Sequence, residues 1–252
     1  MLIKAKELKG YSLKSLDGDI GSVSEFYFDD RYWTIRYLIA NTANWLTGRQ
    51  VLISPYSLKG VNQAVEELSV RLTRKQVEDS PSIETDEPVS RKYEGAYNGY
   101  YGYPDYWNGP YMWGGYPYIV QERAKWDLSA SQSMETEGHL RSTNEVTGYN
   151  LLAIDGEIGH VDDFILDDET WSIRYLVVAT RNWWPGKKVL ISPKWIDDVS
   201  WGESEVTIGL SRDAIRAAPE YTDELLLTRD YETGLYGHYN REGYWVDELA
   251  AV

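Results

Sequence analysis

Short stretches of the chain alternate apolar and polar residues with a period of two. In "LSVRL" (68–72) the apolar Leu68, Val70 and Leu72 alternate with Ser69 and Arg71, and "VTIGL" (206–210) is similar. This alternation is typical of a strand with one buried face. "WTIRYLIA" (33–40) and "WSIRYLVV" (171–178) also read as strands, and "QVLISP" (50–55) and "KVLISP" (188–193) as short strands ended by proline. The pattern predicts a mainly β protein.

These stretches recur because the chain contains a duplication. Residues 10–107 align without a gap with residues 148–245 at a constant offset of 138. The shared residues include Gly21/Gly159, Trp33/Trp171, Arg36/Arg174 and Pro55/Pro193. A period of this length is far too long for a solenoid repeat, so each copy is expected to have its own core.

Turn and helix signals complete each copy. "DGDIG" (17–21) and "DGEIG" (155–159) carry the Asp-Gly pair that favours tight hairpin turns. Thr73, with Gln76 three residues later, is placed to cap a short helix, and Ser211 is placed to cap its counterpart. Several strands with one short helix predict a small antiparallel β-barrel in each copy.

The shared pattern "G..L...DG.IG.V.DF..DD..W.IRYLVV....W..G..VLISP" resembles the PRC-barrel domain, over about 75 residues of each copy. That family includes the cytoplasmic part of the photosynthetic reaction-centre H subunit and the C-terminal half of the ribosome maturation factor RimM. The resemblance implies a β-barrel that serves as a docking or assembly module without chemistry of its own. The chain lacks the membrane helix of the H subunit and the N-terminal domain of the ribosome factor.

An aromatic stretch follows each barrel. "YEGAYNGYYGYPDYW" (93–107) aligns with "YETGLYGHYNREGYW" (231–245). Both carry an aromatic or apolar stripe at helical spacing, and Gly95 and Gly99 weaken the first helix. The stripe residues are Tyr93, Tyr97 and Tyr101, then Tyr231, Leu235 and Tyr239, and all of them except Tyr93 are candidates for partner binding. The stripe can be buried on its own barrel, on the other barrel or on a second chain, and a homodimer with exchanged arms is one hypothesis.

These features divide the chain into five parts. They are a first PRC-barrel (1–80), its aromatic arm (81–107), a linker (108–139), a second PRC-barrel (140–218) and a second arm with the tail (219–252).

Composition excludes several classes of function. There is no cysteine, and the net charge of −15 argues against non-specific binding of nucleic acid or anionic membranes. No apolar run approaches the length of about 18 residues that a membrane helix needs. We therefore expect a cytoplasmic protein that does not insert into the membrane. We expect no cofactor, because no phosphate loop, nucleophile elbow or zinc-protease motif is present.

The acidic pairs of the sequence are better explained as structure than as chemistry. Asp29-Asp30 and Asp167-Asp168 lack the ligand spacing of an EF-hand loop, so polar turns are favoured over metal sites. Arg36 and Arg174 lie within apolar strands, where an unpaired buried charge costs several kcal/mol. We expect them to form structural ion pairs with Asp29 and Asp167; anion binding is the alternative.

Tryptophans in loops are the remaining candidates. Trp45 and the adjacent Trp183 and Trp184 are expected either to cover an open barrel end or to bind a partner. We interpret the protein as a non-catalytic interaction or assembly module whose protein partner is unknown, with a possible family link to photosynthetic electron transport. The alternative is a ligand-binding protein or enzyme whose site lies between the barrels and is lined by Trp and Tyr.

Overall fold

The computed structural model describes residues 1–42, 46, 49–81, 89–106, 140–180 and 187–246, and the backbone alone of 111–112 and 116–117. The chain divides into two compact units. Unit 1 comprises Met1, Ile3–Ser142 and Asp168–Ser172, and unit 2 comprises Leu2, Thr143–Asp167 and Ile173–Val252. "Copy" refers below to the sequence repeat and "unit" to these compact bodies.

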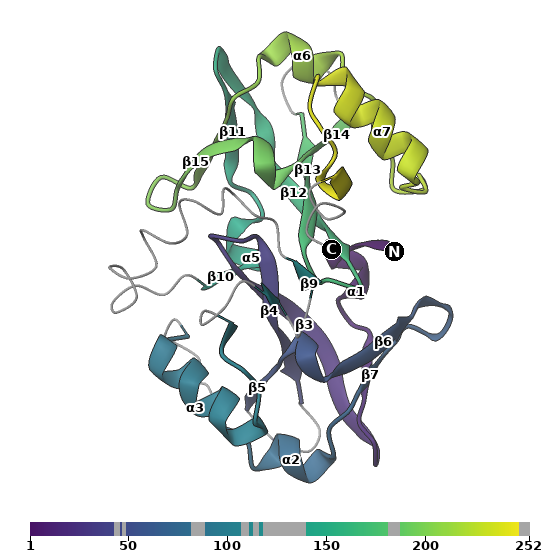
Figure 1. The fold of residues 1–252 in the computed structure, drawn as a ribbon, viewed down its shortest axis with the longest axis vertical. Helices are drawn as coiled ribbons and strands as arrows, with labels where there is room; N and C mark the ends of the chain where they lie inside the picture. Colours follow the sequence, from purple (N-terminus) through teal and green to yellow (C-terminus); the bar gives the residue numbers. More distant parts are fainter. Residues whose placement is uncertain are drawn as a thin grey trace. The chain divides into compact units, whose positions relative to one another are not determined.

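Unit 1 is built on a seven-stranded sheet in the order β5-β4-β3-β2-β7-β6, with β10 paired to β3 (Figure 1). The strands are β2 (Ser12–Lys14), β3 (Asp19–Asp29), β4 (Thr34–Asn41), β5 (Gln50–Ile53), β6 (Leu58–Asn62), β7 (Glu67–Val70) and β10 (Leu140–Ser142). The helices are α1 (Ala5–Leu8), α2 (Arg74–Glu78) and α3 (Arg91–Tyr101), with 3-10 turns η1 (Pro55–Ser57) and η2 (Gln63–Val65). A small ladder pairs β8 (Tyr111–Met112) with β9 (Tyr116–Pro117), inside the predicted linker.

Unit 2 repeats this plan in the order β14-β13-β12-β11-β16-β15, and β1 (Leu2–Lys4) pairs with β12. Its strands are β11 (Asn150–Ala153), β12 (Gly156–Asp167), β13 (Ile173–Ala179), β14 (Lys188–Ile191), β15 (Ile196–Ser200) and β16 (Glu205–Ile208). Its helices are α5 (Thr143–Val146), α6 (Arg212–Arg216) and α7 (Arg229–His238), with the 3-10 turn η4 (Pro193–Trp195).

The prediction of a mainly β fold is confirmed, but the sheets are not purely antiparallel. β2 pairs in parallel with β7, and β11 in parallel with β16. β6 and β7 form a hairpin, and β7 runs beside β2 in the same direction. The parallel pair of β2 and β7 is therefore separated in the sequence by the strands β3 to β6. Among the described residues the hydrogen-bonded path ends at β5 and β6 in unit 1 and at β14 and β15 in unit 2, and it does not close into a barrel.

The helix ends follow from the capping residues. Thr73 accepts the backbone N–H of Gln76, and Gln76 accepts the N–H of Thr73, so the predicted capping box is confirmed. Ser211 caps α6 by accepting the N–H of Ala214, as predicted. Ser90 likewise caps α3.

One glycine of the duplicated motif is required by backbone packing. A Cβ atom added to Gly21 would lie 2.0 Å from the carbonyl oxygen of Asn41 on β4. At Gly159 the same atom would lie 2.0 Å from the carbonyl oxygen of Ala179 on β13. The "IG" step of both copies therefore allows the long strand to approach its neighbour closely.

The sequence suggested that the tryptophan of "WTIRYL" begins the strand. The structure places it before the strand instead. Trp33 and Trp171 have left-handed backbones, with φ of 51° and 57°, and each ends the turn before the strand. The N–H of Trp33 donates to the carbonyl oxygen of Asp29 at 2.7 Å. Both faces of β4 are buried, because residues 34–40 are all buried.

Unit 1 also contains short segments of the second copy. β10 and the turn Asp168–Ser172 belong to unit 1, whereas the sequence assigned both to the second barrel. Leu2 of the first copy belongs to unit 2.

Candidate functional site

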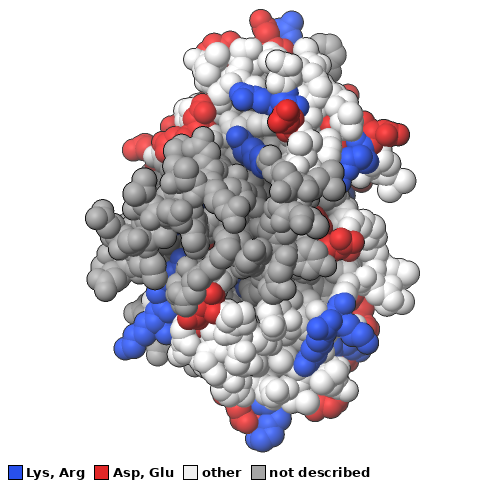
Figure 2. Space-filling view, in the orientation of Figure 1, with Lys and Arg blue, Asp and Glu red and all other residues white. Residues whose placement is uncertain are grey.

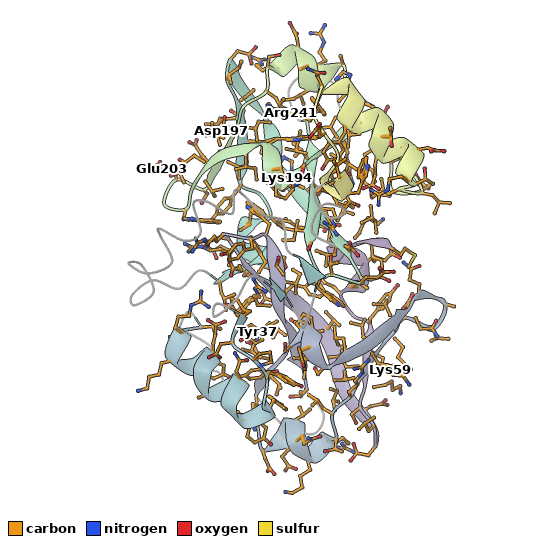
Figure 3. All side chains as sticks on the ribbon, in the orientation of Figure 1. Tyr37, Lys59, Lys194, Asp197, Glu203 and Arg241 are labelled. Carbon is orange, nitrogen blue, oxygen red and sulfur yellow. The ribbon has the colours of Figure 1, made fainter. Side chains whose placement is uncertain are left out.

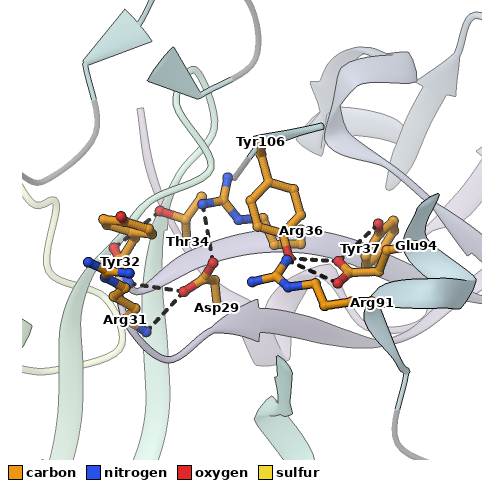
Figure 4. A network of polar contacts seen from close by, with 9 residues as sticks. All are labelled: Asp29, Arg31, Tyr32, Thr34, Arg36, Tyr37, Arg91, Glu94 and Tyr106. Carbon is orange, nitrogen blue, oxygen red and sulfur yellow. Dashed lines mark hydrogen bonds and ion pairs between the residues drawn. The ribbon is translucent and has the colours of Figure 1, made fainter. Parts of the chain in front are cut away.

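A group of buried polar side chains in unit 1 lies between β4 and the aromatic helix α3 (Figure 4). At its centre Glu94 Oε1 accepts hydrogen bonds from the hydroxyl groups of Tyr106 at 2.6 Å and Tyr37 at 3.2 Å. Arg91 Nη1 donates to Glu94 Oε2 at 3.1 Å and to the Tyr106 hydroxyl at 2.7 Å. Tyr37 lies on the side of β4 that faces α3 (Figure 3).

The predicted ion pair forms the other end of this group. Arg36 Nη2 lies 3.5 Å from Asp29 Oδ2, and both side chains are almost fully buried. Asp29 Oδ1 also accepts the backbone N–H groups of Arg31 and Tyr32, which fixes the turn after β3. The Arg36 guanidinium lies 3.8 Å from the centre of the Tyr106 ring, a cation–π contact that joins the two ends. We name the whole set the Glu94 cluster: Asp29, Arg36, Tyr37, Arg91, Glu94 and Tyr106.

Burial governs the electrostatics of the Glu94 cluster. Desolvation raises the pKa of Glu94, and the nearby Arg91 opposes this shift. Desolvation, followed by the charge of Glu94, raises the pKa of Tyr37 and Tyr106 well above the ordinary tyrosine value. Both tyrosines therefore stay protonated at neutral pH and act as hydrogen-bond donors to the carboxylate.

The second copy builds the same cluster. The hydroxyl groups of Tyr175 and Tyr244 donate to Glu232 Oε1 at 2.7 and 2.9 Å, and Arg229 lies 3.0 Å from Glu232 Oε2. Arg174 donates to Asp167 Oδ2 from Nε at 3.0 Å and from Nη2 at 2.5 Å. The Arg174 guanidinium lies 4.0 Å from the Tyr244 ring centre. All six residues of this Glu232 cluster stand 138 positions after their counterparts: Asp167, Arg174, Tyr175, Arg229, Glu232 and Tyr244.

These clusters anchor the aromatic helices rather than present reactive groups. The carboxylate of each glutamate accepts two hydroxyl donors and pairs with one guanidinium, and it is 2% exposed in Glu94 and 3% in Glu232. A buried carboxylate supplied with donors in this way holds its surroundings in one arrangement. The two predicted pairs, Arg36 with Asp29 and Arg174 with Asp167, are thus brought together within these larger networks.

Sequence reasoning did not identify Glu94, Glu232 or the tyrosines as part of these networks. Their signal was present, because Arg91, Glu94 and Tyr106 are identical at offset 138 to Arg229, Glu232 and Tyr244. Residues between them differ, as at Tyr97 and Leu235. When two equivalent helices differ in most residues, a charged residue that is identical in both is expected to pair with a buried partner, because a buried polar group needs its hydrogen bonds.

The stripe residues of the arms are covered inside their own units. Tyr97 and Leu235 are fully buried, Tyr239 is 7% exposed, and Tyr101 and Tyr231 are half-buried. Tyr97 lies in a core cluster with Tyr37, Ile39, Leu52 and Val89, and Tyr93 and Tyr101 pack against that cluster. The helical stripe therefore exists, and its side chains are packed against the same unit.

The three loop tryptophans of the sequence analysis, Trp45, Trp183 and Trp184, lie outside the described residues. The adjacent acidic residues are engaged in ion pairs: Asp30 with Arg141, Asp162 with Lys188, and Asp168 with the N-terminal amine. Within the part of the chain that the structure describes, no group of three or more His, Asp or Glu residues is arranged to hold a metal ion.

Charge and hydrophobicity add two observations. On the face drawn in Figure 2, the described Lys and Arg side chains are spread among Asp and Glu and form no continuous basic patch. Across the described residues, every helix is too short or too polar to cross a bilayer.

Comparison with known proteins identifies the second copy. The model of the PRC-barrel domain family matches residues 140–213. Among curated proteins, no match to the chain was found. The matched range begins at β10 and ends within α6, so it covers strands β11 to β16 but not β1, the seventh strand of that sheet. Residues 140–213 are therefore similar to the PRC-barrel domain family.

Proposed function

We propose that the protein is a non-catalytic interaction and assembly module built from two PRC-barrel units. The family match over residues 140–213 supports a barrel-type module in the second copy. Unit 1 supports a second one, since its strands follow the same order and carry the same Gly21 contact and the same Glu94 cluster. The buried polar groups are occupied in anchoring helices, so binding is assigned to the surface.

The observation that carries this proposal is an exposed aliphatic side chain retained at the same place in both copies. Leu16 is 67% exposed and Ile154, its counterpart at offset 138, is 70% exposed. Burying such a side chain contributes about 1.5–3 kcal/mol, which a partner gains by covering it. An exposed aliphatic residue retained twice is therefore best explained by binding.

The turn that presents each of these side chains is held rigidly. Asp17 Oδ1 accepts the N–H of Arg74 at 2.7 Å, and Asp155 Oδ1 accepts the N–H of Arg212 at the same distance. The N–H of Leu16 donates to the carbonyl oxygen of Leu72 at 2.8 Å. A preorganised contact residue loses little conformational entropy on binding, which favours affinity.

The partner is proposed to be a protein rather than nucleic acid, because the chain carries a net charge of −15. The resemblance to the reaction-centre H subunit makes proteins of electron-transport complexes the first class to test. Since the arms pack within the chain, a homodimer through the aromatic arms requires the same packing to form between chains, as in domain swapping.

Affinity capture from the native cell tests the proposal. The tagged full-length protein is expected to retain a partner that the double variant Leu16→Ser/Ile154→Ser loses. Val65→Ser is the matched control, because Val65 is 62% exposed but has no aliphatic counterpart at position 203. A partner retained equally by all three proteins would contradict the assignment of these turns to binding, and light scattering on the same samples reports any homodimer.

The alternative of a ligand site lined by Trp and Tyr gains no support from the arms. Tyr97, Leu235 and Tyr239 are packed inside their units, where they contact neighbouring side chains. We therefore propose no second function.

A further inference from the structure

The edge of β3 at residues 27–29, beyond its pairing with β2, is occupied by a strand that belongs to the second copy. We propose that this edge is a strand-docking site for residues 140–142, and that this docking keeps the two copies associated when the connection between them is cut. The proposal is independent of the partner assigned above, because it concerns contacts within the chain itself.

Backbone pairing sets the register of the docked strand. β10 pairs antiparallel with β3, with Leu140 opposite Asp29, Arg141 opposite Phe28 and Ser142 opposite Tyr27. An open strand edge presents unpaired N–H and C=O groups, and an added strand satisfies them. A ladder of three residues is too short to be stable alone, so side-chain contacts must contribute.

Side chains on both sides of β10 supply these contacts. Leu140 packs against the core cluster that contains Tyr37 and Tyr97. Arg141 Nε donates to Asp30 Oδ2 at 3.0 Å, and these side chains are only 26% and 11% exposed. The Ser142 hydroxyl donates to Glu25. The strand is thus held by one apolar contact, one ion pair and one hydrogen bond.

A second segment of the second copy, Asp168–Ser172, is docked in unit 1 as well. The N–H of Ile35 donates to the carbonyl oxygen of Trp171 at 2.9 Å, and the Trp171 ring lies 6.3 Å from that of Phe26. An isolated antiparallel bridge joins Thr34 with Ser172. These two residues are the same position of the two copies, since 34 + 138 = 172.

The first copy contributes the matching segment. β1 (Leu2–Lys4) stands 138 residues before β10, is followed by a four-residue helix as β10 is, and pairs with β12. Leu2 accordingly belongs to unit 2. Each copy therefore gives its first strand to the long strand of the other sheet.

The full-length chain with a specific protease site inserted after Gln132 tests the proposal. The protein is folded first and then cut, and the products are followed by size-exclusion chromatography and native mass spectrometry. We expect the two fragments to remain together as a 1:1 particle. Separation of the fragments after cutting overturns the proposal.

Charge reversal at the docked strand identifies the contact responsible. In the cut protein, Arg141→Asp is expected to increase the dissociation rate about tenfold, because it places two acids together at a half-buried site. The swap Arg141→Asp/Asp30→Arg is expected to restore the rate to within about threefold of the parent. Arg241→Asp is the matched control, because Arg241 is exposed and its substitution makes the same change of charge in the same fragment.

Two further results would overturn the assignment to β10. One is an equal rate for Arg141→Asp and Arg241→Asp, and the other is a double variant no slower than Arg141→Asp. Circular dichroism before cutting verifies that each variant is folded. If Arg141→Asp fails to fold, Ser142→Ala takes its place; it removes the hydroxyl contact to Glu25, and an unchanged rate would then count against the docking site.

Discussion

The two aromatic helices solve one packing problem with different residues. In α3, Tyr97 stands three residues after Glu94. Its hydroxyl accepts the N–H of Ser54 at 3.0 Å and donates to the carbonyl oxygen of Leu52 at 3.1 Å. In α7 the equivalent residue is Leu235, and the next residue, Tyr236, directs its hydroxyl to Ser192 Oγ at 3.2 Å. Ser54 and Ser192 are the same serine of "LISP". The helix has changed which position carries the tyrosine, while the hydroxyl still reaches the same serine.

The polar clusters show the reverse behaviour, because their residues are identical but their burial differs. The Asp29 side chain is 2% exposed and that of Asp167 is 14% exposed. Arg91 is 28% exposed, whereas Arg229 is 51% exposed. The Glu94 cluster is therefore more completely sealed from water than the Glu232 cluster. Removing the same residue is therefore expected to change the free energy of unfolding by different amounts in the two units, since the cost of an unpaired charge depends on its access to water.

The largest difference is expected when the strand arginine is removed. Arg36→Leu leaves Asp29 buried without its cation and is expected to cost about 3–5 kcal/mol in unit 1. Arg174→Leu is expected to cost less, about 1–3 kcal/mol, because the Asp167 carboxylate reaches solvent. Hydrogen exchange of the amides of β4 and β13 measures the two losses separately within one chain.

Arg71→Leu is the control for this comparison. Arg71 is exposed and directly follows β7, so its replacement is expected to change stability by less than about 0.5 kcal/mol. Equal losses for Arg36→Leu and Arg174→Leu would show that burial does not separate the two clusters. An unchanged protection of β4 in Arg36→Leu would remove the structural role of the ion pair.

A smaller difference is expected at the two tyrosines that reach the "LISP" serine. Tyr97→Phe leaves both the N–H of Ser54 and the carbonyl oxygen of Leu52 without a hydroxyl partner and is expected to cost about 2 kcal/mol. Tyr236→Phe removes a single bond between two hydroxyl groups and is expected to cost about 1 kcal/mol. Urea unfolding followed by hydrogen exchange in α3 and α7 measures both. A larger loss in α7 than in α3 would contradict the difference in hydrogen bonding.

The sequence was sufficient for much of this architecture but not for its polar core. Strand alternation, the Asp-Gly turns and the Thr73 and Ser211 caps depend on residues close in sequence, and these predictions are confirmed. The pairing of Arg36 with Asp29 was also predictable, because only seven residues and one turn separate them. Glu94 was not, since its partner Tyr37 lies 57 residues away and only the tertiary fold brings them together.

The exchanged strands were missed for a related reason. "LIK" (2–4) and "LRS" (140–142) are short and share only leucine, so no periodicity marks them as strands. Their conformation depends on the edges to which they dock. The parallel pairing of β2 with β7 was missed as well, because hairpin signals report only pairs that are adjacent in sequence.

The smallest expected effect depends on pH and concerns Glu94 in unit 1. Desolvation raises the pKa of Glu94 in the folded protein, so the folded state binds a proton at this carboxyl more tightly than the unfolded state does. The stability that this group contributes is therefore greatest below its unfolded pKa and is lost as the pH rises through the raised, folded value. As the pH falls toward the ordinary glutamate pKa of about 4.3, the wild-type protein should thus gain stability in α3 relative to Glu94→Gln, whose amide does not titrate.

The comparison with Glu94→Gln isolates this carboxyl from the other acids, which titrate alike in both proteins. Protection of the α3 amides, corrected for intrinsic exchange rates at each pH, is the measurement. If the difference in α3 protection between wild type and Glu94→Gln is constant with pH, the Glu94 carboxyl has the same pKa in the folded and the unfolded state. Its deeper burial would then have no electrostatic consequence, and the contrast between the two clusters would be one of packing alone.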